Sequence, residues 1–388
     1  MEVVDMESQV SQKYVINWLN ASFIIGIPIL AFASAIWHGF TYGIGWTEAI
    51  IFFIWYIFCG LSITVGYHRL FSHRSHEASW PLILFYSLFG AGAFQNSIIE
   101  WCSDHRNHHK VTDKVGDPYN AKRGFIWSHV GWIIMEEEIE ADFSNVRDLM
   151  DNPIIAWQHR HIFLIGFIVG MVFPAAIGYA IGGIGVGIGC FIWGGLLRTV
   201  FVHHGTFLIN SAAHIWGRQP YTTANTSRDS MILSLFTFGE GFHNYHHAFQ
   251  ADYRNGYKWY HWDPSKWWIS SFKLLRFNRN LKKTPNYSIE VAKLDTKYAK
   301  ESERVLSKNA DADLSKFDRL ILQYRTSMRD TMHKIATAKK QFKMPDFREK
   351  RELLRQQIAE IRADLKSVKK EIQVLFAEMR KVSAPIPA

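Results

Sequence analysis

Four long apolar segments constrain the fold of this chain more than any other feature of its sequence. Crossing the hydrocarbon core of a bilayer takes about twenty consecutive apolar residues in a helix, and each segment is close to that length. Short connections join them in pairs: residues 38–48 in the first pair and a turn around Gly182 in the second. The pattern predicts an all-α membrane protein with four transmembrane helices in two hairpins, at residues 18–37, 49–66, 162–181 and 183–202.

The basic residues predict the side of the membrane on which each part lies. Neither connection contains Lys or Arg, whereas the remaining polar segments contain many. Cytoplasmic loops carry the excess of Lys and Arg, so we expect both hairpin tips to face outward and the rest to be cytoplasmic. A fifth apolar run, residues 80–99, would put basic clusters on both sides if it crossed. We therefore interpret it as a helix buried in, or lying along, the cytoplasmic face.

Three clusters of histidines, here called boxes, lie at the ends of apolar segments. The first box has a spacing of five residues, and the other two repeat the spacing i, i+3, i+4, which places side chains on one face of a helix. Neutral imidazole is a ligand for iron, copper and zinc, and a set of this size can fill the inner shells of two metal ions. The candidate ligands are His68 and His73; His105, His108 and His109; His243, His246 and His247; and His214, with Asn210 acting through a water.

Two other kinds of metal site fit the sequence less well. A soluble four-helix di-iron bundle needs two Glu-x-x-His motifs and further glutamates, and only Glu240 with His243 has that spacing. A zinc hydrolase needs fewer ligands and an open coordination position. Cys59, Cys102 and Cys190 form no Cys-x-x-Cys pair, so we expect buried thiols and no disulfide framework.

The boxes and the motifs around them resemble the integral-membrane fatty acyl desaturases, specifically the acyl-CoA (stearoyl-CoA type) branch. The resemblance covers roughly residues 15–275 and rests on residues 66–74, 94–96, 100–101, 104–110, 117–118, 123–125, 128–132, 210–214 and 239–247. It implies two iron ions (Fe2+/Fe3+) held by the nine candidate histidines, with O2 as the oxidant. It also implies insertion of a cis double bond into a saturated long-chain acyl-CoA, at the delta-9 position.

Desaturation of an alkyl chain would require a redox partner. An unactivated methylene has neither an acidic proton nor a leaving group, so the protein must position the substrate at a metal-generated oxidant and exclude side reactions. Two external electrons are needed, and the sequence contains no haem-attachment motif, ferredoxin-like cysteine set or Gly-x-Gly-x-x-Gly fingerprint. We expect a separate electron donor, which could be a ferredoxin, rubredoxin, cytochrome b5 or flavin reductase.

Basic residues near the boxes are candidates for binding the phosphates of coenzyme A, because Arg above all makes charge-assisted hydrogen bonds to phosphate. Contact with anionic lipid is the alternative. These candidates are Arg106, Lys110, Lys122, Arg123 and Arg198.

The tunnel for the acyl chain is expected to end on the second apolar segment. Thr64, Gly60 and Tyr56 precede His68 at steps of four and share its face of a helix. Gly60 leaves space and Tyr56 fills it, which suits a tunnel end; close helix packing at Gly60 is the alternative. The family resemblance assigns chain-length control to the same part of this segment. It also assigns Gln95, Trp101 and Thr206 to the bend of the tunnel.

The composition changes after Arg276 to mostly charged and amide residues. We interpret residues 1–276 as the membrane-embedded domain with its cytoplasmic cap, 277–310 as a linker, and 311–388 as an antiparallel helical hairpin or coiled coil. Pro345 and Asp346 separate its two helices. Heptad seams run through Leu314, Phe317, Ile321, Tyr324, Met328, Thr331 and Ile335, and through Leu354, Ile358, Ile361, Leu365, Val368, Ile372, Leu375 and Met379. The hairpin could join copies of the chain into an oligomer, or it could be a solvated tail.

Other functions stay open from the sequence. A histidine-box hydroxylase or ketolase acting on alkyl or lipid substrates would share the metal site. A membrane metal-binding or transport protein would need ionisable groups inside the spans, and the four segments contain almost none. No nucleic-acid partner is expected. The lack of a signal peptide, an organelle signal and a fused electron-donor domain favours a bacterial inner membrane, with the endoplasmic reticulum as the alternative.

Overall fold

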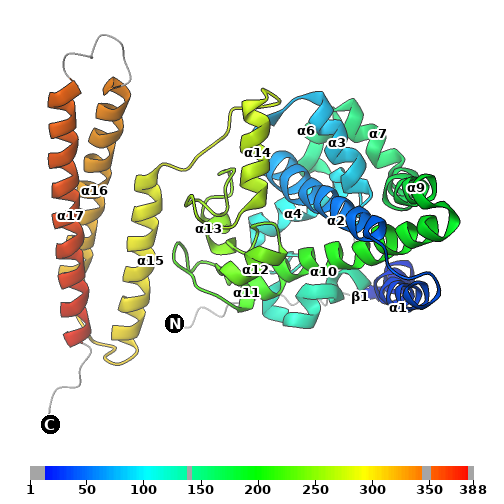
Figure 1. Cartoon of the computed structure of the whole chain (residues 1–388). Helices are drawn as coiled ribbons and strands as arrows, with labels where there is room; N and C mark the ends of the chain where they lie inside the picture. The colour runs from blue at the N-terminus through cyan, green and yellow to red at the C-terminus, as the bar shows by residue number, and fades with distance from the viewer. Residues whose placement is uncertain (1–13, 138–141, 343–350, 383–388) are drawn as a thin grey trace. The chain divides into compact units, whose positions relative to one another are not determined.

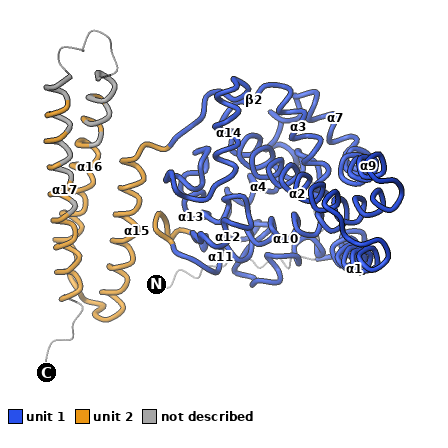
Figure 2. The backbone as a smooth tube through the Cα atoms, viewed as in Figure 1, with its two compact units in different colours: residues 1–218, 225–283 blue, residues 219–224, 284–388 orange. Residues whose placement is uncertain are grey.

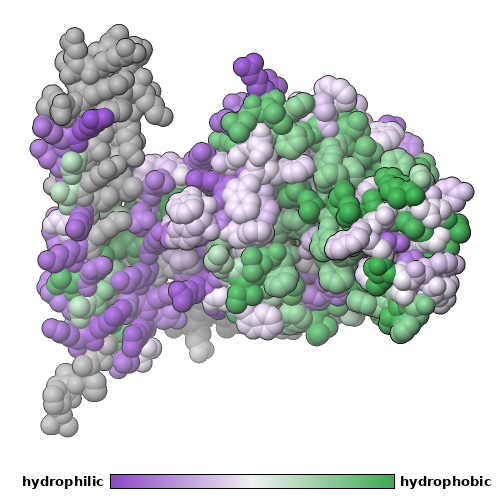
Figure 3. All heavy atoms as spheres, viewed as in Figure 1, coloured by the Kyte–Doolittle hydropathy of each residue, from purple (hydrophilic) through white to green (hydrophobic). Residues whose placement is uncertain are grey.

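The computed structural model describes residues 14–137, 142–342 and 351–382, and the chain in these ranges is mostly helical (Figure 1). It divides into two compact units (Figure 2): unit 1 comprises residues 1–218 and 225–283, and unit 2 comprises residues 219–224 and 284–388. Unit 1 carries the apolar segments and the histidine boxes, whereas unit 2 carries the charged C-terminal helices. Figure 3 shows the same contrast on the molecular surface, with hydrophobic residues gathered over unit 1 and hydrophilic residues over unit 2.

Three helical segments of unit 1 are long and apolar enough to span a membrane: Trp18–Thr41, Trp46–Ser72 and Ile162–Ile215. The first is α1 (Trp18–Thr41), and the second is α2 (Trp46–Leu61) continued by the π-helix η1 (Ser62–Ser72). The third runs through α8 (Ile162–Phe167), η5 (Ile168–Val172), α9 (Phe173–Cys190), η6 (Phe191–Leu197), α10 (Arg198–Asn210) and α11 (Ala212–Ile215). Large apolar side chains of α1, such as Ile29 and Ile36, are exposed, as expected of a helix that faces lipid. These segments make the chain a membrane protein.

A turn divides the third segment into two arms. The backbone leaves the helical region at Gly182 and Gly183, and the φ angle of Gly183 is 75°, in the left-handed region that favours glycine. The arms pack against each other, because a Cβ atom added at Gly178 would lie 2.5 Å from Sγ of Cys190. With 54 residues, the segment is more than twice as long as one crossing requires. The break lies at the Gly-Gly pair where the sequence predicts a hairpin turn.

The apolar run at residues 80–99 forms no span-length helix. It contains α3 (Trp80–Ala91), which has 12 residues, and the start of α4 (Ile98–Val111). Between them, Phe94 and Asn96 have positive φ angles of 56° and 64°. Because α3 rises only about 18 Å, it is shorter than a hydrocarbon core of about 30 Å. This agrees with the interpretation of the run as a buried or interfacial helix.

A hydrophobic cluster fixes the helices that carry the first two boxes. It joins α2, η1, α3 and α4 and contains the buried side chains of Trp55, Tyr67, Tyr86 and Ile98. Short elements complete unit 1. They are the antiparallel pairs β1 (Tyr14–Ile16) with β3 (Met135–Glu137) and β2 (Glu77–Ala78) with β4 (Asn278–Arg279), the short helices η2 (Ala121–Arg123), η3 (Trp127–Gly131) and η4 (Ser144–Val146), and the helices α5 (Trp132–Ile134), α6 (Arg147–Met150), α7 (Pro153–Arg160), α12 (Met231–Phe236), α13 (His243–Ala248) and α14 (Pro264–Leu274).

Unit 2 contains a helix that the sequence analysis did not predict. α15 (Asn286–Leu306) occupies most of the segment interpreted as a linker, and α16 (Ser315–Phe342) and α17 (Arg351–Val382) follow it. Leu294 and Tyr298 of α15 pack into the cluster that α16 and α17 form. The residues Leu294, Tyr298 and Val305, at spacings of four and seven, share one face of α15, which composition alone does not reveal. The segment 219–224 belongs to the same unit, where Lys300 donates a 2.6 Å hydrogen bond to the carbonyl of Gln219.

The predicted heptad seams lie partly in the core of unit 2. Phe317, Ile321, Met328, Ile372, Leu375 and Met379 are buried there. Phe376, outside the predicted seam, is buried as well, because packing in a three-helix unit widens the buried face of α17. Pro345, Asp346 and the side chains of Ile335, Leu354, Ile358, Ile361 and Leu365 lie outside the described residues. The buried seam residues pack within one chain, so an oligomer would have to use other surfaces of this unit.

Candidate metal centre

The nine histidines selected from the sequence converge in two groups, and within each group the candidate ligand nitrogens lie within 4.8 Å of one another. The first group contains His68, His73, His105, His109 and His246. The second group contains His108, His214, His243 and His247. Every one of these side chains is buried or half-buried.

A π-helix brings the two histidines of the first box together. In an α-helix, residues five apart point about 140° away from each other. In η1 the backbone N–H of His73 instead donates to the carbonyl of His68, five residues earlier, at 3.1 Å. The two ring centres are 4.8 Å apart. π-Helical turns often occur at functional sites. Here the turn makes two side chains that are five residues apart, those of His68 and His73, point the same way.

The other two boxes each supply both groups. His105 and His109, four residues apart on α4, join the first group, and His108 joins the second. The third box is the reverse, since His243 and His247 of α13 join the second group and His246 joins the first. Two short helices therefore hold the groups side by side.

The spacing of the imidazole nitrogens fits a metal ion in each group. Around a transition metal with nitrogen ligands at about 2.1 Å, neighbouring ligand atoms are about 3.0–3.4 Å apart. In the first group, Nε2 of His246 lies 2.9 Å from Nε2 of His68 and 3.0 Å from that of His109. In the second group, Nε2 of His243 lies 3.1 Å from Nε2 of both His214 and His247.

Carboxylates outside the groups fix the tautomers of two ligands. Glu240 accepts a hydrogen bond from Nδ1 of His68 at 2.9 Å, and Asp117 accepts one from Nδ1 of His108 at 2.8 Å. A neutral imidazole with its proton on Nδ1 has a lone pair on Nε2, and these lone pairs face the other imidazoles of their groups. A cation between the rings would satisfy them, so the residues present fit metal ions.

His214 is oriented in the same way through a hydroxyl. Its Nδ1 lies 2.8 Å from Oγ1 of Thr226, which itself donates to Asp113 at 2.9 Å. Because the hydroxyl proton goes to the carboxylate, Thr226 accepts the imidazole proton and leaves a lone pair on Nε2 of His214.

Burial keeps the groups in the form that binds metal. It lowers the pKa of His73, His105, His109 and His246 in the first group, and of His243 and His247 in the second, well below the ordinary 6.5. Positive charge on neighbouring imidazoles would lower each pKa further. Burial works to raise the pKa of Asp117, but the hydrogen bonds from His108 and two backbone N–H groups hold it below its ordinary value. The imidazoles are thus neutral and the carboxylate ionised near pH 7.

Several of these orienting residues were missed in the sequence analysis. Asp113, Asp117 and Thr226 were not selected, and Glu240 was considered only as part of a carboxylate-bundle motif. Asp113, Asp117 and Glu240 lie within ten residues of a box, which is a usable signal, whereas Thr226 has no distinctive motif.

Similarity to known proteins agrees with this geometry. The family model described as fatty acid desaturase matches residues 44–272. The chain belongs to the fatty acid desaturase family. It is 42% identical over 277 residues to a probable acyl-CoA desaturase of Schizosaccharomyces pombe and 39% identical over 279 residues to acyl-CoA desaturase 1 of Saccharomyces cerevisiae. Each alignment covers 71% of this chain and, respectively, 56% and 54% of the yeast protein, so the chain spans about half the length of these relatives. It is also 32% identical over 273 residues to an sn-1 stearoyl-lipid 9-desaturase of Anabaena variabilis, which covers 70% of this chain and 96% of that relative.

These relatives bear on the location of this desaturase-family member. The sequence analysis favoured a bacterial inner membrane. The two yeast proteins are more similar to the chain than the cyanobacterial one is. These similarities therefore speak against the bacterial inner membrane.

A cavity of about 640 Å³ reaches the first group. His68 and His105 line it, as do the predicted substrate residues Gln95, Trp101 and Thr206 and the predicted water-holding residue Asn210. The amide of Gln95 donates to Oγ1 of Thr206 at 3.0 Å. Trp101 stacks on the ring of His105 with centres 4.9 Å apart. The volume is in the range of sites that enclose a small-molecule ligand, about 300–1,000 Å³.

Gly60 and Tyr56, the predicted end of the tunnel, are not among the described residues that line this cavity, whereas Thr64 of the same helix face is. A Cβ atom on Gly60 would collide with the ring of Phe238, and the rings of Tyr56 and Phe238 are 5.1 Å apart. Gly60 lacks a side chain because Phe238 occupies that space. This contact favours the alternative interpretation, close packing, and the tunnel end stays a prediction.

Two of the five basic residues make their hydrogen bonds within the protein. Arg198 is buried and donates to three backbone carbonyls, those of Gly194, Gly92 and Gly170, at 2.7–3.0 Å. Arg106 donates to the carbonyls of Phe71, Ser72 and Asn145 and to the carboxylate of Asp148. Both guanidinium groups bind elements of the fold to one another, so these contacts give no support to the prediction that they bind phosphate.

The other three basic residues are exposed, and one lies beside the cavity. Lys110, Lys122 and Arg123 are on the surface. Arg123 lies over the ring of Trp127, 3.1 Å from its centre, and donates to the hydroxyl of Tyr14 at 2.6 Å. Both aromatic residues line the cavity, so Arg123 is still a candidate for binding a charged head group.

Proposed function

We propose that this protein is an O2-dependent di-iron desaturase that inserts a cis double bond at the delta-9 position of a saturated long-chain acyl-CoA. The observation that carries the proposal is the convergence of nine imidazoles in two groups, with a ligand-sized cavity against the first. Family membership supports it, as do relatives named acyl-CoA desaturases. One relative is named a stearoyl-lipid 9-desaturase, so the carrier of the acyl chain needs a direct test.

The proposal assigns one iron to each group. The first group would bind through its five histidines, and the second through its four with Asn210 acting through a water. The chemistry that iron supplies when bound is the removal of two hydrogens from adjacent methylenes by O2, with two external electrons and two protons, to give an alkene and two waters.

The residues of the chain would orient the ligands and the substrate. Glu240 and Asp117 hold protons at Nδ1 of His68 and His108, which directs Nε2 toward the metal position. Trp101 covers the ring of His105 on the cavity side. The hydrogen bond between Gln95 and Thr206 joins two elements of the cavity wall and so limits the path of an acyl chain.

The head group of acyl-CoA would bind where Tyr14 and Trp127 line the cavity. Arg123 is held there by Tyr14 and Trp127, and Lys122 is its exposed neighbour. An arginine whose planar group is already stacked loses little freedom on binding phosphate. Reversing the charge of Arg123 should raise the Michaelis constant for acyl-CoA more than it lowers turnover.

We further propose four membrane crossings with both hairpin tips facing outward and the metal centre on the cytoplasmic side. The length of the third apolar segment and its break at Gly182 and Gly183 support two crossings there. The distribution of Lys and Arg supports the orientation. A separate electron donor would then bind from the cytoplasm.

The test is reconstitution of the purified protein in lipid bilayers with iron, a ferredoxin or cytochrome b5 with its reductase, and stearoyl-CoA. Gas chromatography with mass spectrometry should find an octadecenoyl product with the double bond at carbon 9, formed only with O2. A hydroxylated or keto product would overturn desaturation in favour of the hydroxylase or ketolase. Turnover of stearoyl-phospholipid but not of stearoyl-CoA would overturn the proposed carrier.

A further inference from the structure

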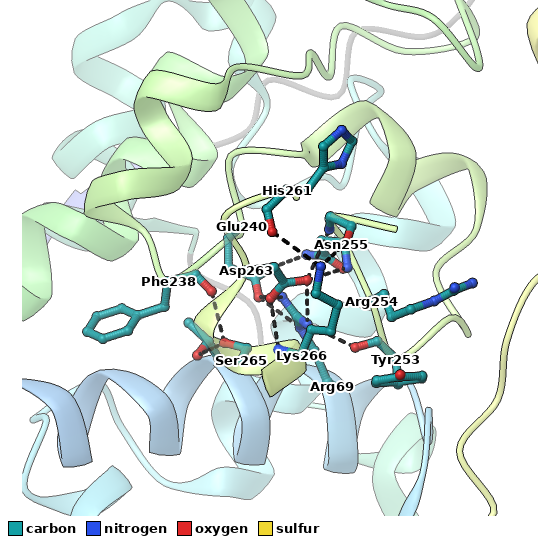
Figure 4. Close-up of polar contacts among 12 residues, drawn as sticks. Arg69, Phe238, Glu240, Tyr253, Arg254, Asn255, His261, Asp263, Ser265 and Lys266 are labelled. Atoms are coloured by element: carbon teal, nitrogen blue, oxygen red, sulfur yellow. Dashed lines mark hydrogen bonds and ion pairs between the residues drawn. The ribbon is translucent and has the colours of Figure 1, made fainter. Parts of the chain in front are cut away.

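A buried ionic network lies directly behind His68. Four of its side chains are almost completely buried: Arg69, Glu240, Asn255 and Asp263 are each at most 1% exposed. They come from η1, the residues before α13, a loop, and the residue that caps α14 (Figure 4). Burying charges is costly unless each is paired and hydrogen-bonded, so this network needs a physical explanation.

Three residues fix the carboxylate of Glu240. Its Oε2 accepts from Nδ1 of His68 at 2.9 Å and from the amide of Asn255 at 2.5 Å. Its Oε1 accepts from Nε and Nη2 of Arg69 at 3.0 and 2.8 Å. With both oxygens bound from different directions, the carboxylate cannot rotate without breaking several hydrogen bonds. The direction of the His68 ring is set accordingly.

Asp263 holds the guanidinium group of Arg69 in turn. Its two oxygens lie 3.0 and 3.2 Å from Nη2 and Nη1 of Arg69. The same carboxylate accepts the backbone N–H groups of Asn255, Gly256 and Lys266, at 2.9–3.0 Å. Asp263 therefore joins the loop that carries Asn255, the start of α14 and Arg69 (Figure 4).

The backbone of Gly239, just before Glu240, packs closely against the carboxylate of Asp263. Gly239 has a φ angle of 96°, and a Cβ atom there would lie 2.6 Å from Oδ1 of Asp263. A side chain at this position would push Glu240 and Asp263 apart. The glycine thus permits the close approach that the network requires.

The second histidine group has a different kind of support. Asp117 accepts from His108 and from the backbone N–H groups of Asp113 and Tyr119. In the described part of the chain, these hydrogen bonds to Asp117 include none from Arg or Lys. Of these two carboxylates, Glu240 is the one that pairs with a buried arginine.

We propose that Asp263 is a positioning residue for the first metal site: through Arg69 and Glu240 it sets the tautomer and direction of His68. This rests on the proposed function, because it takes the first histidine group to bind metal. Asp263 belongs to neither histidine group and is not among the described residues that line the cavity. Its effect should therefore appear in the affinity and spectrum of one metal ion, and the other ion should be unaffected.

The experiment is a titration of the purified metal-free full chain with Co2+, followed by the visible absorption of the bound ion. The wild type should bind two equivalents. Asp263→Asn keeps an oxygen that can cap α14 but removes the charge that holds Arg69. Loss of such indirect support typically weakens metal binding by about 10- to 100-fold, so one equivalent should weaken by that factor with a changed spectrum. The other should titrate as in the wild type.

Two further variants separate positioning from general stability. Asp252→Asn is the matched control, because Asp252 is also buried and paired with an arginine, Arg254, in the same loop region. It should leave both Co2+ equivalents unchanged. Asn255→Ala removes a neutral donor to Glu240 and should weaken the same single equivalent as Asp263→Asn, by a smaller factor. It provides the test if Asp263→Asn does not fold.

The outcomes distinguish this inference from the proposed function. A wild type that binds no Co2+ would overturn the metal centre itself. A wild type that binds two equivalents, with Asp263→Asn and Asn255→Ala unchanged, would overturn only the positioning role. Equal weakening of both equivalents, or the same loss in Asp252→Asn, would show a structural role and also overturn it.

Discussion

The two histidine groups are similar in their ligands and differ in what holds them. In the first, Glu240 supports His68 and is itself held by Arg69 and Asn255, and Asp263 holds Arg69 in turn. Except for Arg69, these residues lie far from His68 in the sequence. In the second, Asp117 supports His108 from nine residues away and is bound by local backbone N–H groups. The contacts of Asp117 can therefore form between residues close in the sequence. Those of Glu240 require that η1, the third box and the start of α14 pack together.

The groups also differ in their access to substrate. His68 and His105 of the first group line the cavity, whereas no member of the second group is among its lining residues in the described chain. The second group instead lies beside Asp117 and the pair Thr226 and Asp113. Asn210, which is proposed to act on the second group through a water, also lines the cavity. We infer that variants of the other cavity residues change how substrate meets the first group and leave the second unchanged.

The largest effect should come from removing one ligand of each group. His246→Ala and His247→Ala alter adjacent residues of α13 that belong to different groups. Each should abolish turnover and lower the bound iron from two ions to about one, because the remaining ligands of the affected group hold iron too weakly. Iron analysis and product analysis measure this.

The matched control for these variants is His76→Ala, which removes a buried imidazole outside both groups. It should keep both irons. Full activity in either His246→Ala or His247→Ala would break the assignment of two metal sites.

A smaller effect should follow from neutralising the two supporting carboxylates. Glu240→Gln should weaken metal binding in the first group, and Asp117→Asn in the second, each by about 10- to 100-fold. Each change replaces one acceptor oxygen of the carboxylate with an NH2 group that faces other donors. The imidazole that the carboxylate supports, His68 or His108, is then no longer held in one orientation. Metal titration of the two variants would sharpen the comparison, and a variant that weakened both sites equally would contradict it.

The pH dependence of stability should reflect both groups. In the folded protein, burial lowers the pKa of His73, His105 and His243 well below the ordinary 6.5, so these imidazoles stay neutral. Below pH 6.5 the unfolded chain binds protons that the folded chain does not, and the free energy of unfolding of the metal-free protein must fall as pH falls. Above pH 6.5 this contribution is constant.

The measurement is the thermal unfolding temperature of the metal-free protein in detergent between pH 8 and 5. His73→Gln should flatten the decrease below pH 6.5, because it removes one of the groups responsible. A decrease confined to pH values above 6.5 would contradict the assignment of buried neutral imidazoles.

The smallest effect should come from the cavity wall. Thr206→Val removes the hydrogen bond from Gln95 with little change in volume, which costs about 0.5–1.5 kcal/mol. The Michaelis constant or the chain-length preference should change by up to about tenfold, with the iron content unchanged.

Gly60→Ala, outside the cavity, should instead lower activity evenly across chain lengths, because its methyl group meets Phe238. An effect of Gly60→Ala that depends on acyl-chain length would instead support the predicted tunnel end.

Much of the metal centre could be predicted because its sequence pattern is local. Histidines four residues apart share a helix face wherever the helix lies, which placed His105 with His109 and His243 with His247. Two adjacent glycines can reverse a chain of apolar residues, and the break falls at Gly182 and Gly183. The distribution of basic residues likewise predicted that the run at residues 80–99 does not cross, and its helix α3 has only 12 residues.

The rest depends on partners distant in the sequence. Arg198 looks like a cation available for phosphate, but in the fold it faces the carbonyls of Gly92 and Gly170. Gly60 looks like space for a substrate, but a ring from position 238 occupies that space. Neither outcome can be read from residue type or periodicity, because each depends on which segment packs alongside.

The sequence by itself determined which imidazoles are available to bind metal and which segments can cross a membrane, because both follow from residue type and short-range spacing. Only the tertiary structure decided how the imidazoles sort into two groups and why His68 and His73 converge. Their spacing of five needs the π-helix η1, which packs against α3 and α4. The pairing of Arg69 with Asp263, 194 residues away, depends on the same packing. Helical periodicity acts within one segment, whereas pairing buried charges requires segments brought together by the whole fold.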